Sequence, residues 1–212
     1  MFRDRADAGH QLADALKDYR GRTDLVLALP RGGVPVGFLV AQALGAPLDV
    51  LIVRKIGAPF HEELGVGALV SGNPPEVVWN ENLLAQLGLT PEGLQRTVDR
   101  ETQEARRREL LYRGDRPSPS VRGKSVILVD DGLATGITAQ AALTALHRCH
   151  PKHLILAIPV APPDTVERLR SLVDDLVCLD TPPWFSAVGQ FYRDFAQTED
   201  EEVIALLGVA KS

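Results

Sequence analysis

The sequence predicts an α/β protein with a doubly wound, mostly parallel central sheet. Two observations support this fold class. Short apolar stretches alternate with segments whose apolar residues recur at helical spacing, which is typical of strand–helix–strand units. The chain also has 212 residues and no internal repeat, which suits one α/β domain with a small appendage. The expected strands are 25–30, 48–54, 125–129, 153–158 and 175–179, and the expected helices are 10–19, 34–45, 90–112, 137–147 and 163–171.

The first strand–helix–strand unit lies near the N-terminus, after the helix 10–19. Residues 25–30, LVLALP, are apolar up to the closing proline, as expected of a short buried strand. Residues 34–45 have helical spacing and end in Gly45, a residue type common just after a helix C-terminus. The apolar run 48–54 then supplies the next strand.

A glycine-rich, polar stretch at 55–67 interrupts this alternation. It carries little apolar periodicity, and we therefore expect a long loop there. The short apolar runs 68–70 and 76–79 flank the turn-forming residues SGNPP, so they predict a hairpin.

The longest expected helix covers 90–112. Thr90 is a suitable N-cap and Pro91 a suitable first helical residue. Arginine and glutamate are interleaved along this helix, which favours a mostly solvated surface. The turn-rich segment 113–123 then links it to the second half of the sheet.

Composition limits the compartment and the partners. The net charge is −5, so no global positive field recruits nucleic acid. Two cysteines, Cys149 and Cys178, are too few for a disulfide framework and favour reduced thiols in the cytoplasm. The charged N-terminus lacks the apolar region of a signal peptide, and the apolar runs are too short to span a bilayer. We therefore expect a soluble cytoplasmic protein with small-molecule partners.

The stretch VILVDDGLATGIT, residues 126–138, carries the chemistry. A buried strand ends at Asp130 and Asp131, and a Gly/Thr loop then leads into a helix whose first N–H groups suit a phosphate. Carboxylates do not bind phosphate directly. They accept hydrogen bonds from sugar hydroxyls or hold a metal ion that bridges to phosphate. The pattern indicates a ribose 5-phosphate site, and an ordinary strand-to-helix turn with an exposed acid pair is the alternative.

This stretch resembles the signature of type I phosphoribosyltransferases, which bind 5-phosphoribosyl-1-pyrophosphate (PRPP). The resemblance implies that Asp130 and Asp131 hold the ribose hydroxyls and contact Mg²⁺ indirectly, through those hydroxyls or water. It also implies that residues 134–138 wrap the 5′-phosphate. The candidate PRPP-binding residues of this stretch are Asp130, Asp131, Gly132, Leu133, Ala134, Thr135, Gly136, Ile137 and Thr138.

The stretch LPRGGVPVG, residues 29–37, resembles the pyrophosphate loop of the same family. Arg31 can grip phosphate oxygens, and Gly32 and Gly33 expose backbone N–H groups. In that family this loop often carries a cis peptide bond that does not precede proline. An ordinary strand–turn–helix connection is the alternative.

A second cationic candidate follows the next strand, in VRKIGAP. Arg54 and Lys55 resemble the basic residues placed before the flexible catalytic loop, and Lys55 is the better candidate for pyrophosphate. Residues 56–66 are then expected to form that flexible loop and close over the site, or to be a mobile surface loop without a catalytic role.

The aromatic-rich segment 181–195 is expected to form the small hood that covers the acceptor in this family. Trp184 and Phe185 are candidates to stack on a planar base, or they pack the C-terminal segment onto the core. The expected division is a core at 1–180, and a hood and C-terminal segment at 181–212.

Much of the chain also resembles bacterial proteins known only as predicted phosphoribosyltransferases, as in FRDRADAG and VGQFYRDF. Signals for the acceptor conflict. Ala134 replaces the aspartate usual in enzymes acting on 6-oxopurines, whereas RGG is closest to the xanthine–guanine enzymes. A purine-like base is the best interpretation.

The resemblance implies a Mg²⁺-dependent phosphoribosyltransferase of nucleotide salvage, a homodimer that takes PRPP and a nitrogenous base. Asp130, Asp131, Arg31 and Lys55 are its candidate catalytic residues. Two alternatives remain. One is a non-catalytic PRPP-binding regulator on the same fold, whose usual nucleic-acid partner the acidic charge disfavours. The other is a different phosphosugar enzyme, such as a nucleotide hydrolase.

Overall fold

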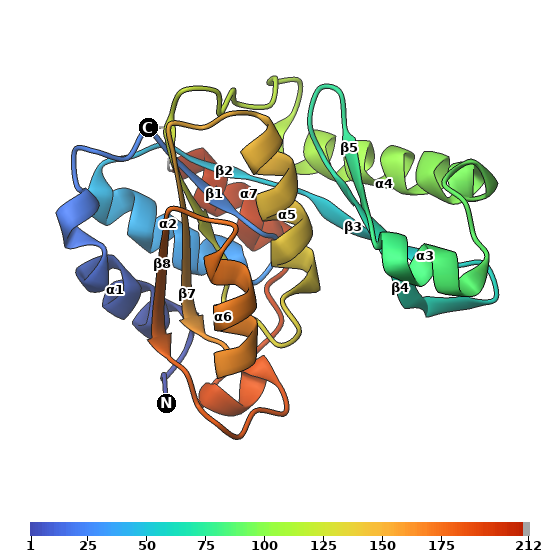
Figure 1. Ribbon diagram of the computed structural model, residues 1–212. Coiled ribbons are helices and arrows are strands. Elements are labelled where there is room, and N and C mark those ends of the chain that lie inside the picture. The colour runs from blue at the N-terminus through green and yellow to red at the C-terminus, as the bar shows by residue number, and fades with distance from the viewer. Residues whose placement is uncertain (210–212) are drawn as a thin grey trace.

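The computed structural model describes residues 1–209, and a five-stranded, all-parallel sheet lies at its centre (Figure 1). The strand order is β2-β1-β6-β7-β8. This confirms the predicted fold class. The strands are β1 (Leu25–Ala28), β2 (Leu48–Val50), β6 (Ser125–Val129), β7 (His153–Val160) and β8 (Asp175–Asp180).

Helices cover both faces of this sheet. Alternate strand residues point to opposite faces, so Val26 packs with one hydrophobic cluster and Leu27 with another. On the first face lie α1 (Arg5–Ala15) and α2 (Gly33–Leu44), and on the second lie α5 (Ile137–Arg148) and α6 (Pro163–Arg170). The near-continuous apolar strands of the sequence are therefore explained by burial on both sides.

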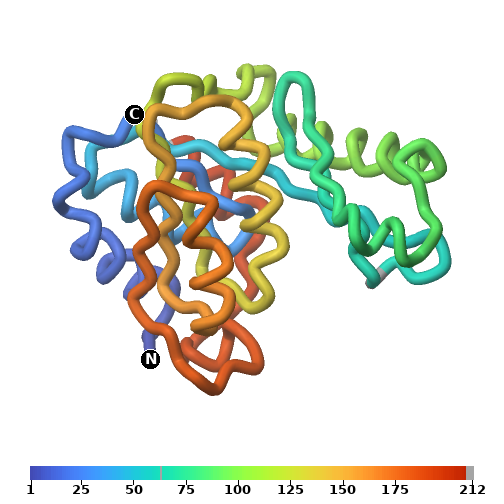
Figure 2. Tube along the Cα trace, in the orientation of Figure 1, coloured from blue at the N-terminus to red at the C-terminus, as the bar shows by residue number. Residues whose placement is uncertain are grey.

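A second, three-stranded antiparallel sheet projects from the core as an arm (Figures 1 and 2). The arm, residues 53–113, contains β3 (Val53–Ala58), β4 (His61–Val70) and β5 (Glu76–Trp79), with α3 (Glu81–Leu87) and α4 (Gln95–Arg113). The predicted pairing of 68–70 with 76–79 is confirmed, since Val70 pairs with Glu76 and Ala68 with Val78.

The predicted long loop at 55–67 is wrong, because most of it forms β3 and β4. Glycines allow the close pairing there: a Cβ at Gly57 would lie 2.2 Å from the Glu62 carbonyl oxygen, and one at Gly67 would lie 2.7 Å from the Trp79 ring. The predicted strand 48–54 is accordingly divided between the two sheets.

Helix ends differ from the prediction where a local hydrogen bond decides them. α1 begins earlier than expected because Asp4 accepts a hydrogen bond from the Asp7 N–H at 2.8 Å, and a 3₁₀ turn at Lys17–Tyr19 follows it. Thr90 does accept from the Gly93 N–H at 3.2 Å, but the bond lies at the start of a 3₁₀ turn, Glu92–Leu94, whose N-cap residue is Pro91 and which precedes α4.

The chain leaves β8 and crosses the carboxyl edge of the central sheet before turning back. A 3₁₀ turn, Val188–Phe191, lies in this crossing, and α7 (Asp200–Val209) then packs on α2 and α4. The sequence did not predict α7. Residues 210–212 of the expected C-terminal segment lie outside the described residues, and the division after residue 180 stays a prediction. None of the helices within residues 1–209 combines the length and apolarity needed to cross a bilayer.

Candidate functional site

The acid pair lies at the carboxyl end of β6, where ligands of parallel α/β sheets bind. The Asp131 N–H donates to Asp130 Oδ1 at 2.9 Å. Arg5 Nε donates to Asp131 Oδ2 at 2.7 Å, and the Tyr192 hydroxyl donates to the Asp131 carbonyl oxygen at 2.5 Å. Both ends of Asp131 are therefore fixed by residues far away in the sequence.

Burial raises the pKa of both carboxyls. Desolvation is the main cause at Asp130, whose pKa lies well above its usual range, and the neighbouring charge of Asp131 raises it further. At Asp131 burial also raises the pKa, but Arg5 opposes this through its hydrogen bond and charge. The pair thus holds its negative charge at a cost, which a ligand with hydroxyl donors or a cation would offset.

The loop after the acids combines buried and exposed positions. Gly132 and Gly136 have φ of +149° and +68°, and both pack so closely on neighbouring segments that a side chain would collide. Leu133 is buried in the core, and its N–H donates to the Val160 carbonyl. The predicted 5′-phosphate stretch is otherwise largely at the surface, with four exposed residues, Ala134, Thr135, Ile137 and Thr138.

Helix α6 supports this loop from outside. Thr165 Oγ1 donates to the Ala134 carbonyl at 2.9 Å, and the Arg168 guanidinium donates to the Thr135 carbonyl. These bonds hold loop carbonyls on the α6 side. The orphan N–H groups that begin α5 suit an anion there.

The predicted pyrophosphate loop lies directly against the acid pair. A Cβ added at Gly32 would lie 2.0 Å from Asp131 Oδ2, and one at Gly33 would lie 3.0 Å from the Asp130 Cα. The Pro30–Arg31 peptide bond is cis, as the family resemblance implied. Only glycine therefore lets these two loops adjoin at the carboxyl edge.

The two cationic candidates are placed differently. Arg31 is half-buried on the core, and its Nη1 lies 3.6 Å from Glu199 Oε2 and 3.8 Å from Asp200 Oδ1. Lys55 is an exposed residue of β3 on the arm, while the adjacent Arg54 pairs with buried Glu101 at 2.9 Å. Arg31 thus lies in the core loop that adjoins the acids, and Lys55 lies in a separate sheet.

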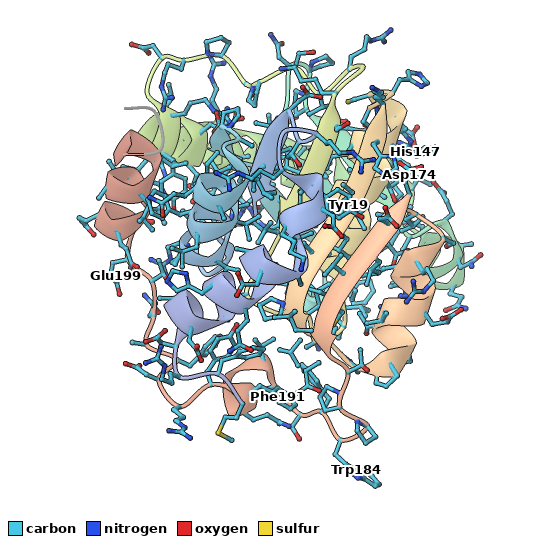
Figure 3. The ribbon with its side chains drawn as sticks, turned by 90° about the vertical axis from the view of Figure 1, so that its left-hand side faces the viewer. Tyr19, His147, Asp174, Trp184, Phe191 and Glu199 are labelled. Carbon is cyan, nitrogen blue, oxygen red and sulfur yellow. The ribbon has the colours of Figure 1, made fainter. Side chains whose placement is uncertain are left out.

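The aromatic candidates of the hood also separate. Trp184 is 86% exposed and points away from the molecule (Figure 3), whereas Phe185 packs on Phe191 with ring centroids 4.9 Å apart. Phe185 also lines a cavity of about 460 Å³ with Thr135, Ile137 and neighbouring residues of α6. Stacking on a base stays a prediction for both.

Sequence reasoning missed Arg5, Tyr192, Thr165 and Arg168. Arg5 stands 126 positions from its partner Asp131, and its local sequence does not separate it from the exposed Arg3. The available signal was the similarity of FRDRADAG and VGQFYRDF to other bacterial chains, and these two segments do meet, because Phe2 pairs with Tyr192.

Fold and site together define a class of protein: a doubly wound α/β domain with an acid pair and two glycine-containing loops at the carboxyl edge of its sheet. The family model for the phosphoribosyl transferase domain matches residues 5–196. The chain belongs to the phosphoribosyl transferase family.

Individual relatives agree with this assignment. Two Mycobacterium tuberculosis proteins, from strains CDC 1551 and H37Rv, have names that provisionally class them as phosphoribosyl transferases. Each is 44% identical over 98% of this chain. The chain spans 46% of the length of each. The crystal structure of TT1426 from Thermus thermophilus is 41% identical, with a TM-score of 0.84 over 98% of this chain and 97% of that one.

Proposed function

We propose that the protein transfers the 5-phosphoribosyl group of PRPP to a nitrogenous acceptor and releases pyrophosphate. The observation that carries this proposal is the contact between Gly32 and the Asp131 carboxylate, which places the loop suited to pyrophosphate beside the acids suited to ribose. PRPP requires such adjacency, because its pyrophosphate and its ribose hydroxyls are on neighbouring carbons of one sugar.

The residues would share the work as follows. Asp130 and Asp131 accept hydrogen bonds from the ribose hydroxyls and favour the positive charge that develops on the ring as the bond to pyrophosphate breaks. The N–H groups opening α5 bind the 5′-phosphate. Arg31 and Lys55 bind the leaving pyrophosphate.

Mg²⁺ fits this donor set. Within residues 1–209 no group of three or more His, Cys, Asp or Glu could by itself hold a metal ion. Mg²⁺ is commonly held by one or two carboxylates, waters and substrate phosphates, and an acid pair beside a phosphate loop meets that need. When bound, the ion would neutralise charge on the pyrophosphate.

A purine-like base is the proposed acceptor. Ala134 offers no acid or base to the acceptor. Phe185 of the hood lies beside the 5′-phosphate loop, which supports recognition of a flat ring by stacking. We also propose that the protein is a cytoplasmic homodimer of nucleotide salvage, as the family resemblance implies.

One observation favours the alternative of a non-catalytic PRPP-binding regulator. Arg31 faces two carboxylates, Glu199 and Asp200, which compete with pyrophosphate for its guanidinium. Pyrophosphate release during incubation with a panel of bases separates the two functions, because a regulator binds PRPP without turnover.

The site itself is tested by calorimetric titration of PRPP with Mg²⁺, alongside ribose 5-phosphate. We expect PRPP to bind more tightly than ribose 5-phosphate, and Gly32→Ala to weaken PRPP by about tenfold or more through its collision with Asp131. The double variant Asp130→Asn/Asp131→Asn should lose binding. Gly208→Ala, where a Cβ meets nothing within 4 Å, is the control. Equal binding by Gly32→Ala and the control would contradict the proposal.

A further inference from the structure

Arg5 is the cation that contacts the acid pair directly, although it lies outside both loops. It is the first residue of α1, and its side chain is 13% exposed. Three contacts hold its guanidinium: Nε donates to Asp131 Oδ2 at 2.7 Å, Nη1 donates to the Ala196 carbonyl, and the Phe195 ring centroid lies 4.0 Å from its central carbon. A planar group held on one face and along two edges has a single orientation.

The guanidinium lies where the two ligand loops adjoin. A Cβ at Gly32 would lie 2.0 Å from Asp131 Oδ2 and 3.3 Å from Arg5 Nε. The carboxylate oxygen and the guanidinium nitrogen therefore both lie next to Gly32 of the pyrophosphate loop. One carboxylate oxygen of Asp131 is thereby fixed against the Gly32 backbone. This orientation leaves the other oxygen, Oδ1, as the acceptor for a ribose hydroxyl.

We propose that Arg5 is a positioning residue for phosphoribosyl transfer, which orients the Asp131 carboxylate toward the ribose through its Nε donor. This role rests on the proposed function. Arg5 also connects the acid pair to the segment 195–196, so the hood segment and the ribose site are held by one side chain.

A purely structural ion pair would give different results from a positioning residue. A structural pair affects the melting temperature and leaves ligand affinity unchanged once the protein is folded. A positioning residue also affects the affinity of the folded protein for every ligand that carries the ribose hydroxyls, whatever its effect on the melting temperature. PRPP and ribose 5-phosphate both carry them, so both ligands serve as probes.

The test compares Arg5→Gln, Arg5→Lys and the control Arg3→Gln by calorimetry with Mg²⁺. Arg3 is a suitable control because its side chain is 73% exposed, and its Nη2 lies 3.7 Å from Asp7 Oδ1, as a surface ion pair. Arg3→Gln removes the same single positive charge as Arg5→Gln. We expect Arg5→Gln to weaken PRPP and ribose 5-phosphate alike, by about tenfold or more, since a charge-assisted bond is lost. Lysine keeps the charge without the planar fork, so Arg5→Lys should recover affinity only in part.

Several outcomes would overturn the role. One is an affinity of Arg5→Gln for PRPP within about twofold of that of the Arg3→Gln control. Another is full recovery of PRPP affinity in Arg5→Lys, which would mean that the positive charge alone suffices. If Arg5→Gln does not fold, Arg5→Lys decides, because lysine keeps the charge but lacks the Nε donor of the planar guanidinium. Weaker PRPP binding by folded Arg5→Lys then supports the role, and unchanged binding overturns it.

Failure of this role can be told apart from failure of the proposed function. If the unaltered protein binds no PRPP, both fall. If it binds PRPP and Arg5→Gln binds equally well, only the role of Arg5 falls. The ¹⁵N-detected Nε–H resonance of Arg5 adds a readout without ligand: it should be protected from exchange, and lose that protection in Asp131→Ala, which removes the acceptor.

Discussion

At the residue scale, two opposing demands meet in the acid pair. Asp130 and Asp131 are adjacent, largely buried carboxyls, which lowers the stability of the fold when both are ionised. The same concentration of acceptor oxygens is what a ribose diol or a hydrated Mg²⁺ needs. The folded protein therefore gives up stability at the position where the proposed ligand would bind.

Asp130→Asn should stabilise the protein at neutral pH and abolish PRPP binding. A raised pKa means that the folded state binds the proton more tightly, so the stabilising effect of Asp130 exists at low pH and is lost as the pH rises through that pKa. Asparagine keeps the Oδ1 acceptor for the Asp131 N–H but carries no charge. The free energy of unfolding at pH 7 should therefore be higher in the variant.

Urea denaturation at two pH values measures this effect. The difference between Asp130→Asn and the unaltered protein should be present at pH 7 and shrink toward zero near pH 4, close to the ordinary aspartate pKa. Asp115→Asn, at an exposed position of the linker, is the control. A variant that is less stable than the unaltered protein at pH 7 would disprove the argument.

At the element scale, the hairpin of β3 and β4 depends on glycine. Gly57→Ala places a Cβ 2.2 Å from the Glu62 carbonyl oxygen, and this backbone contact forces the strands apart. We expect a loss of about 1–3 kcal/mol in the free energy of unfolding, together with slower pyrophosphate release because Lys55 lies in the same strand.

Gly93→Ala is a matched control on the same arm, since its Cβ would meet only the Thr90 hydroxyl at 3.4 Å. Chemical denaturation and turnover of both variants are the measurements. If Gly57→Ala matched Gly93→Ala in both, the hairpin would not need its glycine.

The same scale explains what could be predicted. The five parallel strands were found because strands buried on both faces are continuous apolar runs, and the two loops were found because they follow such strands. Within the arm, the hairpin of 68–70 with 76–79 was found, but the strands at 55–67 were missed. His61, Glu62 and Gly65 break the apolar pattern of β4, which gets its order from pairing with β3 and β5. The Arg5–Asp131 bond joins residues 126 positions apart and depends on the whole fold.

At the scale of the whole molecule, the core and the arm share one hydrophobic cluster. Val26 and Ile127 of the central sheet belong to the same cluster as Ile56 and Leu69 of the arm. Buried Arg113 adds a polar connection, because it ends α4 and donates to Asp49 and to the Val50 carbonyl of β2 at 3.1 and 2.9 Å. These contacts imply that the arm and the core unfold together.

Leu207→Ala tests this cooperativity, because α7 packs on α2 of the core and on α4 of the arm. Leu207 is 1% exposed, so the truncation should cost about 2–5 kcal/mol of unfolding free energy. Ile204→Ala, on the same helix but 40% exposed, should cost far less.

Two probes then report on the two parts. The chain has two tryptophans, so in a Trp184→Phe background the fluorescence of Trp79 follows the arm, while far-ultraviolet circular dichroism follows the whole molecule. We expect both transitions to coincide in the unaltered protein and to move together in Leu207→Ala. A Trp79 transition that stayed in place while the dichroism moved would show that the arm folds independently. Lys55 would then be carried to the acid pair by a mobile unit rather than by an extension of the core.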